Sequence, residues 1–442
     1  MNAVIKHGDL IQKLLDDTDE SLEFDSVLDL CRIYRVPENI RRGNEELYTP
    51  LLISIGPLHH GTPKLAVMEN KKKQYLKSCC ERTKTENIDR ILSFIEDNER
   101  TIRACYAEAS TLESLEFVIM ILYDSISIIE LFLRERFQDR SDISPNKISL
   151  CRDLQLFENQ LPYFVLEKIY KLAFDVSYSN PSLMELSCYF FGDTTSVEHG
   201  CYLSRLTEGE SVKHFTDWKR ITLLKSDPGY AELPKEFSGE LPKEFSGERV
   251  YNLPCAVKLH ESGVKFIRKK IAKNIFDIKF KKRKQLIPFF KVDELQIPQL
   301  SVNKWTQGEF GNIIALEQCL YPDNALVCNY VELMAHLINT KEDVDLLDER
   351  GIISNQTGDN VLVANMFKKF NVLAGPTSYN QVCADLKRHY NNPWNRVKVN
   401  LKIGTLKRVY FNNPWKGAAT VAAIILLLLT VVQTICSILQ VT

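Results

Sequence analysis

The stretch TLESLEFVIMILYDSISIIELFLRERF, residues 111–137, carries apolar side chains almost all the way round a helical projection. Glu116, Asp124 and Glu130 interrupt the apolar run, and acidic side chains are rare and costly inside a bilayer. The stretch therefore predicts a central helix of a soluble core rather than a membrane span. A helix of this kind is enclosed by other helices, so the sequence favours a helix-rich fold.

Further helices are predicted towards the C-terminus. Two groups of apolar residues recur at helical spacing and predict amphipathic helices: Tyr330, Leu333, Met334, Leu337 and Ile338, and then Leu362, Val363, Met366, Phe367 and Phe370. Between them, KEDVDLLDERGII (residues 341–353) predicts a short helix that ends at Gly351.

The middle of the chain has a different pattern. SGVKFIRKK (262–270), FDIKFKKRKQLIPFF (276–290) and LQIPQLSV (295–302) are rich in aromatic and branched residues, and Pro and charged residues interrupt them. Such segments are typical of short strands. The predicted fold class is therefore helix-rich α+β: a large helical domain with a small antiparallel sheet and one C-terminal transmembrane helix.

The C-terminal stretch KGAATVAAIILLLLTVVQTICSILQVT, residues 416–442, predicts a membrane anchor. No residue from 417 to 442 is charged, and 417–439 is long enough to cross a bilayer as a helix. Tyr410, Trp415 and Lys416 stand where residues of the membrane interface are expected. Basic residues flank only the N-terminal side of this span, which predicts a tail-anchored, single-pass protein with residues 1–416 in the cytosol, at the plasma membrane or an endomembrane. The N-terminal residues lack the apolar core of a signal peptide.

The formal net charge of −1 hides two basic regions. Residues 258–291 carry twelve Lys or Arg against two acidic residues, and residues 386–416 carry eight against none. Membrane lipid is the expected partner of 417–439, and anionic lipid headgroups are expected to contact the run Lys279, Lys281, Lys282, Arg283 and Lys284. The run also fits a solvated hairpin tip. Its likeness to a nuclear localisation patch is opposed by the predicted span, and no nucleic-acid partner is expected.

A tandem repeat marks an internal boundary. LPKEFSGE occurs at 233–240 and again at 241–248, and such polar repeats are typical of loops that tolerate insertion. The predicted organisation is an N-terminal extension (1–29), a helical part of the domain (30–228), the duplicated loop (229–250), a mixed α+β part of the same domain (251–385), a basic juxtamembrane segment (386–416) and the transmembrane helix (417–439).

Two stretches carry the candidate site residues. SIGPLHHGTPKLAVMENKK (54–72) contains His59, His60 and Glu69, with Pro63 placed to open a helix. Glu69 is four residues before Lys73, which favours an ion pair. Adjacent histidines on a loop point in different directions and seldom bind one metal. The stretch fits a structural turn better than an acid–base or metal site.

CRDLQLFENQLPYFVLEKIY (151–170) places Asp153 and Glu158 among apolar residues, so their carboxylates are expected to be buried. Asn159, Gln160 and the free N–H groups of a helix start near Pro162 are the expected donors. With Asp124 these carboxylates could form a metal or general-acid site. The alternative is a polar network that fixes how helices pack.

Other motifs indicate no cofactor. The chain has no G-x-x-x-x-G-K, no G-x-G-x-x-G after a strand and no G-x-S-x-G. Its twelve cysteines contain no C-x-x-C pair and predict reduced thiols rather than a disulfide framework. Asn355 begins the single N-glycosylation sequon, which matters only if the domain is lumenal.

Several ordered segments resemble the plant domain-of-unknown-function family 247, also catalogued as uncharacterised protein family 0481. They are RIYRVPENIR, YTPLLISIGPLHHGTPKLAVMENKK, CRDLQLFENQLPYFVLEKIY, LPCAVKLHESGVKF, FDIKF, NIIALEQC, DVDLLDERGII and YFNNPW. The resemblance covers about residues 31–439 and implies a plant protein with one large helix-rich domain, a C-terminal membrane helix and no accepted enzyme activity. Some grass members look like self-incompatibility determinants. The family tends to have a D-G-C-F-like stretch where this chain has Asp124-Ser125-Ile126-Ser127, which disfavours a shared active site.

Three function classes follow. The preferred one is a membrane-anchored, non-catalytic recognition or signalling module with unknown protein partners. The second is a membrane-tethered hydrolase or metal-dependent enzyme that uses Asp124, Glu158, His59 and His60. The third is extracellular recognition, with residues 1–416 outside the cell. The second class requires its side chains to line one water-filled cleft, and the third would be marked by glycosylation of Asn355.

Overall fold

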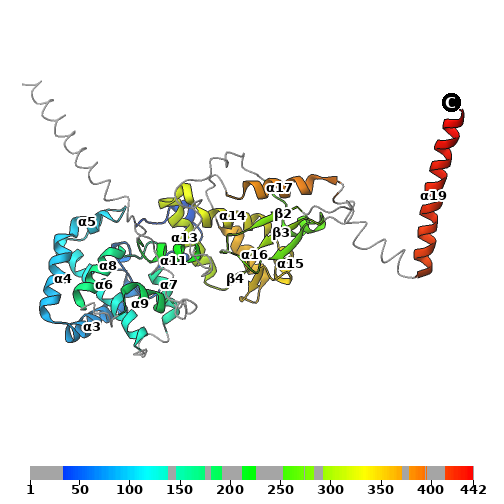
Figure 1. Cartoon of the computed structure of the whole chain (residues 1–442). Helices are drawn as coiled ribbons and strands as arrows, with labels where there is room; N and C mark the ends of the chain where they lie inside the picture. Colours follow the sequence, from blue (N-terminus) through cyan, green and yellow to red (C-terminus); the bar gives the residue numbers. More distant parts are fainter. Residues whose placement is uncertain are drawn as a thin grey trace, which may run out of the picture.

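Helices form most of the ordered chain, and five short strands lie near its middle, within the residues that the structure describes (Figure 1). The structure is a computed structural model that describes residues 33–137, 146–174, 181–191, 212–224, 252–272, 274–282, 292–370, 378–393, 395 and 414–441. The helix-rich α+β class is therefore confirmed. Several predictions lie outside the described residues: the extension 1–29, the loop 229–250, Arg283, Lys284, Tyr410 and most of the juxtamembrane segment.

The N-terminal half is a group of helices. It begins with α2 (Glu38–Arg41) and three short 3-10 helices, η1 (Glu45–Leu47), η2 (Pro57–His59) and η3 (Pro63–Leu65). The larger helices are α3 (Ala66–Arg82), α4 (Thr85–Asp97), α5 (Glu99–Ala104), α6 (Ser114–Arg136), α7 (Lys147–Leu154), α8 (Tyr163–Ala173), α9 (Leu183–Phe190) and α11 (Phe215–Leu224).

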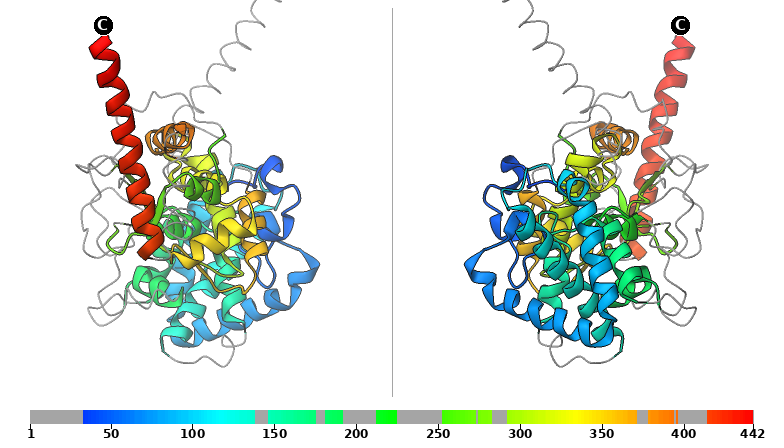
Figure 2. Two further views of the ribbon diagram at one scale, coloured as in Figure 1. Left: turned by 90° about the vertical axis from the view of Figure 1, so that its right-hand side faces the viewer. Right: turned by 90° about the vertical axis from the view of Figure 1, so that its left-hand side faces the viewer.

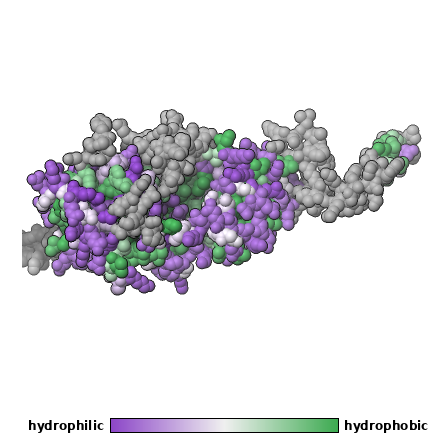
Figure 3. All heavy atoms as spheres, turned by 90° about the horizontal axis from the view of Figure 1, so that it is seen from below, coloured by the Kyte–Doolittle hydropathy of each residue, from purple (hydrophilic) through white to green (hydrophobic). Residues whose placement is uncertain are grey.

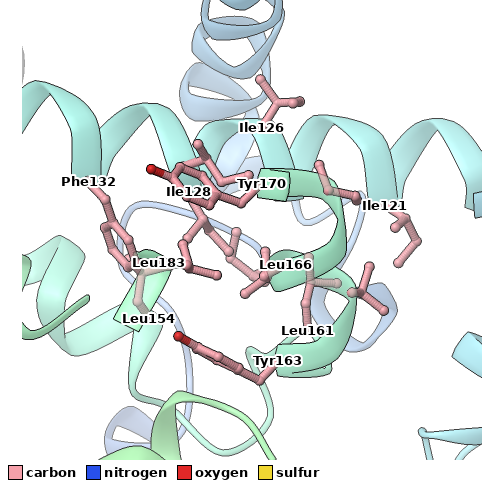
Figure 4. Packing of buried hydrophobic residues seen from close by; sticks show 14 of the residues in the cluster. Ile121, Ile126, Ile128, Phe132, Leu154, Leu161, Tyr163, Leu166, Tyr170 and Leu183 are labelled. Atoms are coloured by element: carbon pink, nitrogen blue, oxygen red, sulfur yellow. The ribbon is translucent and has the colours of Figure 1, made fainter. Parts of the chain in front are cut away.

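Helix α6 is the centre of this half, as residues 111–137 predict. It packs against α3, α4, α8 and α9, and it buries apolar side chains on most of its circumference. Ile121, Ile128 and Phe132 of α6 lie in one apolar cluster with Leu166 of α8, and Ile126 of the same cluster points to the opposite side of α6 (Figure 4). The all-round apolar pattern is satisfied by neighbouring helices, which is the arrangement expected of a buried helix.

The C-terminal half mixes helices and strands. Its elements are α12 (Ala256–Glu261), β1 (Lys265–Arg268), β2 (Lys279–Lys281), β3 (Glu294–Ile297), β4 (Leu300–Val302), α13 (Thr306–Leu320), η7 (Pro322–Asn324), α14 (Leu326–Leu337), α15 (Lys341–Glu349), β5 (Ile353–Asn355), α16 (Asn360–Lys369) and α17 (Asn380–Asn391). Strands β1 to β4 lie within the three segments where the sequence predicts strands, whereas β5 was not predicted, and the pairing differs from the prediction.

The prediction of one antiparallel sheet is wrong. A three-stranded sheet has the order β1-β3-β2, with β1 parallel and β2 antiparallel to β3. A second sheet pairs β4 with β5 in parallel, joining Leu300 to Ile353. Pro298 separates β3 from β4. Proline has no backbone N–H and its ring fixes the backbone angle φ, which favours the end of a strand there. The segment LQIPQLSV is thus divided between two sheets.

The predicted helices of this half are present. The face of α14 predicted to be apolar is buried, and α15 ends before Gly351, which has a positive φ of 67°. Helix α16 buries Val363, Met366 and Phe367, but Leu362 is 58% exposed, contrary to its predicted place on the inner face. Leu362 is adjacent to Val363, so the two side chains point about 100° apart on the helix.

Three clusters of buried side chains make up the core. One lies in the N-terminal half between Ile33 and Trp218, and the second lies between Leu253 and Leu386. The third joins the halves: Val36, Ile40, Tyr48 and Phe157 pack against Ala315 and Leu316 of α13. Figure 1 shows the corresponding order, with α11 and α13 between the helical half and the sheets.

Helix α19 (Pro414–Val441) stands apart from the other elements in Figure 1, and in the two side views of Figure 2 it overlaps them. Large apolar side chains along it, including Leu426, Leu427 and Val432, are exposed. Figure 3 shows its coloured atoms as mostly hydrophobic, whereas the coloured surface of the rest is largely hydrophilic. Over the residues described, no helix satisfies both the length and the apolarity required to cross a membrane. The predicted span of residues 417–439 is therefore not confirmed.

Candidate functional site

The extended segment 51–56 lies at the centre of the candidate site. It belongs to neither sheet, so side chains rather than a neighbouring strand bind its backbone groups. The carboxylate of Asp153, on α7, accepts hydrogen bonds from the N–H groups of Leu51, Leu52 and Ile53 at 2.9, 2.6 and 3.1 Å. Buried backbone groups need such partners, and one carboxylate supplies three of them here.

Two amide side chains complete the binding of this region. Asn159 accepts a hydrogen bond from the N–H of Ile55 at 2.7 Å and donates one to the carbonyl of Ile53 at 3.0 Å. Gln160 donates to the carbonyls of Leu154 and Leu156, and it accepts from the N–H of Phe215 at 2.8 Å. Asn159 thus holds the segment, and Gln160 holds its own loop against α11.

Asp124 and Lys72 hold the other end of the segment. Lys72, on α3, donates to the carbonyl of Ser54 and to the carboxylates of Asp124 and Glu69, each at 2.6 Å. Asp124, on α6, also accepts the N–H of Gly56 at 2.8 Å. Burial alone would lower the pKa of Lys72, but the two carboxylates outweigh it and raise that pKa. The predicted partner of Glu69, Lys73, is replaced by Lys72, which lies three residues away on the same helix.

Glu158 anchors the chain that precedes this segment. Its buried carboxylate accepts the N–H of Val36 at 2.7 Å and contacts the guanidinium of Arg41. His59 Nε2 lies 3.1 Å from the second carboxylate oxygen. Burial would raise the pKa of Glu158, but the donors from His59, Val36 and Arg41 overcome burial and hold it below its usual value.

The two histidines diverge, as expected for a structural turn. His59 faces Glu158, whereas His60 Nε2 lies 3.8 Å from Glu116 of α6. In the described part of the chain, no three His, Cys, Asp or Glu side chains are placed to hold one metal ion. His59, His60 and Glu69 therefore have separate partners, and the structure does not bring them together as one site.

The three buried carboxylates do surround one segment, but each has its own donors. Asp153 binds three N–H groups, Asp124 binds Lys72 and Gly56, and Glu158 binds Val36 and Arg41 through Oε1, while its Oε2 makes an ion-pair contact with His59 Nε2 at 3.1 Å. A groove of about 360 Å³ lies between α4 and α8, lined by Asp89, Arg90, Ser93, Phe94, Asp97, Asn98, Lys168 and Leu172. A smaller hollow lies near Tyr48. No candidate carboxylate lines either one, so the arrangement matches the polar network rather than a water-filled cleft.

The sequence interpretation missed some donors. It expected N–H groups near Pro162 to bind Asp153 and Glu158, but the donors come from residues 36 and 51–53. It also missed Lys72, whose side chain is fully buried. A lysine three residues after Glu69 on a predicted helix was the available signal, since that spacing also places two side chains together.

The cysteines differ in part from the expectation of reduced thiols. Among the described residues, nine cysteines have free thiols: Cys79, Cys80, Cys105, Cys151, Cys255, Cys319, Cys328, Cys383 and Cys436. Cys188, on α9, is disulfide-bonded. Disulfides persist mainly in oxidising compartments, so this bond bears on the topology of the chain.

We expect Gly56→Ala to destabilise the fold by about 3 kcal/mol, because two costs add. Gly56 has φ 71° and ψ −177°, a region that only glycine adopts readily. A Cβ there would also lie 2.6 Å from the carbonyl oxygen of Gln160 and 2.9 Å from Tyr106 Oη. Gly61→Ala is the control, since Gly61 has φ 74° but open space, and should cost about 1 kcal/mol. Chemical denaturation measures both, and equal losses would contradict the close packing described.

The fold and this site together define a helix-rich α+β protein in which buried carboxylates hold an extended segment. The chain belongs to the family DUF247, described as plant protein of unknown function, whose profile matches residues 33–429. It is 27% identical to the UPF0481 protein At3g47200 of Arabidopsis thaliana, over 93% of this chain and 87% of that protein. It is 21% identical to the putative UPF0481 protein At3g02645 of the same plant, over 96% and 93%. No solved structure matches the chain.

Proposed function

We propose that the chain is a membrane-tethered, non-catalytic recognition or signalling module. The observation that carries the non-catalytic part is the use of the carboxylates. Asp124, Asp153 and Glu158 are all buried, and the hydrogen bonds that they accept come from backbone N–H groups and cations of the same fold. A general acid or base must reach the proton that it transfers, and these groups lie outside the hollows described.

The membrane tether is argued from the C-terminal sequence. Residues 417–442 carry no charge, and α19 exposes large apolar side chains that no other described element covers in Figure 1. An uncovered helix of this composition is favoured in lipid, where each Leu, Ile or Val contributes up to about 0.6 kcal/mol towards insertion. The basic residues before it favour a cytosolic position for residues 1–416, at the plasma membrane or an endomembrane.

A second candidate function is recognition outside the cell, and one observation favours it. Cys188 is disulfide-bonded, and such bonds are rare in the cytosol. The same fold would then face the cell exterior on the same tether. Asn355 would be open to glycosylation, although its Nδ2 donates to Asn360 at 2.6 Å and its Oδ1 accepts from Thr357.

We expect the full chain, expressed in plant cells, to stay in the membrane pellet after an alkaline carbonate wash, while a variant lacking residues 417–442 moves to the supernatant. The physical reason is that carbonate removes peripheral proteins but not a helix dissolved in lipid. The measurement is the fraction of protein in each phase. Release of the full chain would contradict the tether.

The same membranes decide between the two topologies. A cytosolic domain gives no change of mass with glycosidase, and the buried Cys188 is alkylated in denaturant without prior reduction. An external domain gives a glycosidase-sensitive mass that Asn355→Gln removes, together with a Cys188 that is protected until reduction. The second result would replace the cytosolic proposal and leave the tether in place.

A further inference from the structure

The three-stranded sheet presents a lysine-rich outer face. Strand residues alternate between two faces, and Phe266 and Leu295 point into the C-terminal core. The opposite face carries Lys265 of β1 and both Lys279 and Lys281 of β2, all of which are exposed. This face is therefore a cationic surface built on regular strands rather than on a loop.

The register places two of these lysines beside one acidic residue. Glu294 of β3 is the cross-strand neighbour of Lys265 on one side and of Lys281 on the other. Glu294 is buried, whereas the two lysines are exposed. Lys279 lies 3.7 Å from Asp277, which is a weak pair at an exposed position. The face keeps a net positive charge after these carboxylates are counted.

An exposed apolar side chain follows the first strand of this surface along the chain. Ile271 follows β1 by three residues, is 76% exposed, and comes directly after Lys270. Exposed lysines next to an exposed isoleucine are typical of a surface that meets lipid headgroups, because the charges attract phosphate while the apolar group enters the interface. A soluble anionic protein partner would gain less from the isoleucine.

The position of the sheet agrees with a lipid partner. Figure 1 shows β2, β3 and α17 at the end of the described body that is nearer to α19. Helix α17 is joined to the sheet by Lys282, which pairs with Asp385 at 2.7 Å, and by His389, whose Nδ1 lies 2.9 Å from Asp293. By sequence, residues 386–416 between the sheet and α19 add eight Lys or Arg and no acidic residue.

We propose that the outer face of the β1-β3-β2 sheet docks on the anionic headgroups of the bilayer that α19 enters, so that the domain lies against the membrane instead of moving freely on its tether. This inference rests on the proposed tether and on a cytosolic position, since anionic lipids are concentrated in the cytoplasmic leaflet. It assigns the contact to three sheet lysines and excludes Lys282, which is paired with Asp385.

The test uses the full chain in vesicles of phosphatidylcholine alone and in vesicles that also contain phosphatidylserine. We expect amide hydrogen exchange in β1 and β2 to slow by about fivefold or more in the anionic vesicles, since one basic residue near such a surface changes its occupancy by about that factor. Both are edge strands, so their outer amides report on coverage. The slowing should disappear at 1 M salt, where the Debye length is about 3 Å.

Two variants that lose the same number of positive charges distinguish an effect of this face from a general effect of net charge. The test variant carries K265Q, K279Q and K281Q, and the control carries K64Q, K73Q and K77Q on exposed positions of the N-terminal half. We expect the lipid-dependent slowing to be lost in the first and kept in the second. If amide exchange in β1 and β2 is equal in both vesicle types while the chain still resists carbonate, the docking proposal is wrong and the tether proposal stands. If carbonate removes the chain from the vesicles, both the tether proposal and the docking proposal are wrong.

Discussion

Replacement of Asp153 by Ala is expected to destabilise the protein by about 4 kcal/mol, enough to unfold much of the N-terminal half. The carboxylate serves the N–H groups of Leu51, Leu52 and Ile53, and Asp153 itself is fully buried. Each buried N–H that loses its acceptor costs about 1–3 kcal/mol. Water that enters the new cavity would accept hydrogen bonds from some of these N–H groups. The expected total cost is therefore below the sum of the three separate costs.

The measurement is thermal unfolding of the full chain in detergent, with an expected fall in Tm of roughly 10 °C. Asp153→Asn keeps the size and one acceptor oxygen, so its loss should be about half as large. Asp348→Ala removes an exposed carboxylate from α15 and is the control, with a change within about 0.5 kcal/mol. An Asp153→Ala variant with normal Tm would show that the carboxylate does not hold the segment.

The same variants separate structure from chemistry. If Asp153, Asp124 or Glu158 were catalytic, the conservative amide variants would lose function while they remained folded. For residues that hold backbone, loss of any cellular phenotype should follow loss of abundance, because destabilised protein is degraded. A folded, abundant Glu158→Gln variant with a complete loss of phenotype would therefore contradict the non-catalytic proposal.

Local patterns predicted the helices well and the pairings poorly, for physical reasons. The periodicity of α6 and α14 records which face is buried, and this information lies within the helix itself. The partner of a strand, in contrast, is not recorded within the strand itself. Strand β4 pairs with β5, about fifty residues later in the chain, and nothing in LQIPQLSV specifies that partner. The parallel register of β1 with β3 is equally non-local.

The candidate site also combines features that neighbouring residues predict with features that depend on distant residues. Burial of Asp153 and Glu158 among apolar residues could be predicted from their neighbours in the sequence. Their donors could not, because Leu51–Ile53 lie about a hundred residues before Asp153, and Val36 lies 122 residues from Glu158. The source of the donors is therefore what supports the proposed structural role over a catalytic one. Lys72 is the exception, since its spacing from Glu69 on one helix is a local signal.

Loss of the Arg220–Glu317 pair is expected to separate the two halves of the molecule. Arg220 of α11 donates from Nε to Glu317 of α13 at 2.8 Å, and both side chains are buried. Glu317 also accepts the N–H of Cys328 at 2.9 Å, while Arg220 donates to the carbonyl of Asn324. Glu317→Ala leaves a buried cation and a buried N–H without partners, and such a change costs about 3–5 kcal/mol.

A double substitution tests whether the pair or the buried charge matters. Arg220→Met with Glu317→Leu replaces the ion pair by apolar groups of similar size. It should regain part of the stability that Glu317→Ala loses, because no uncompensated charge remains, while the N–H of Cys328 and the carbonyl of Asn324 still lack these partners. Denaturant unfolding gives the free energies, and amide exchange gives the location: in Glu317→Ala, α11 and α13 should lose protection before α6 does.

If the double variant is no more stable than Glu317→Ala, the cost lies in packing at the junction and the uncompensated-charge explanation is wrong. If α6 loses protection together with α11, the halves unfold as one unit and the junction is not the weak point.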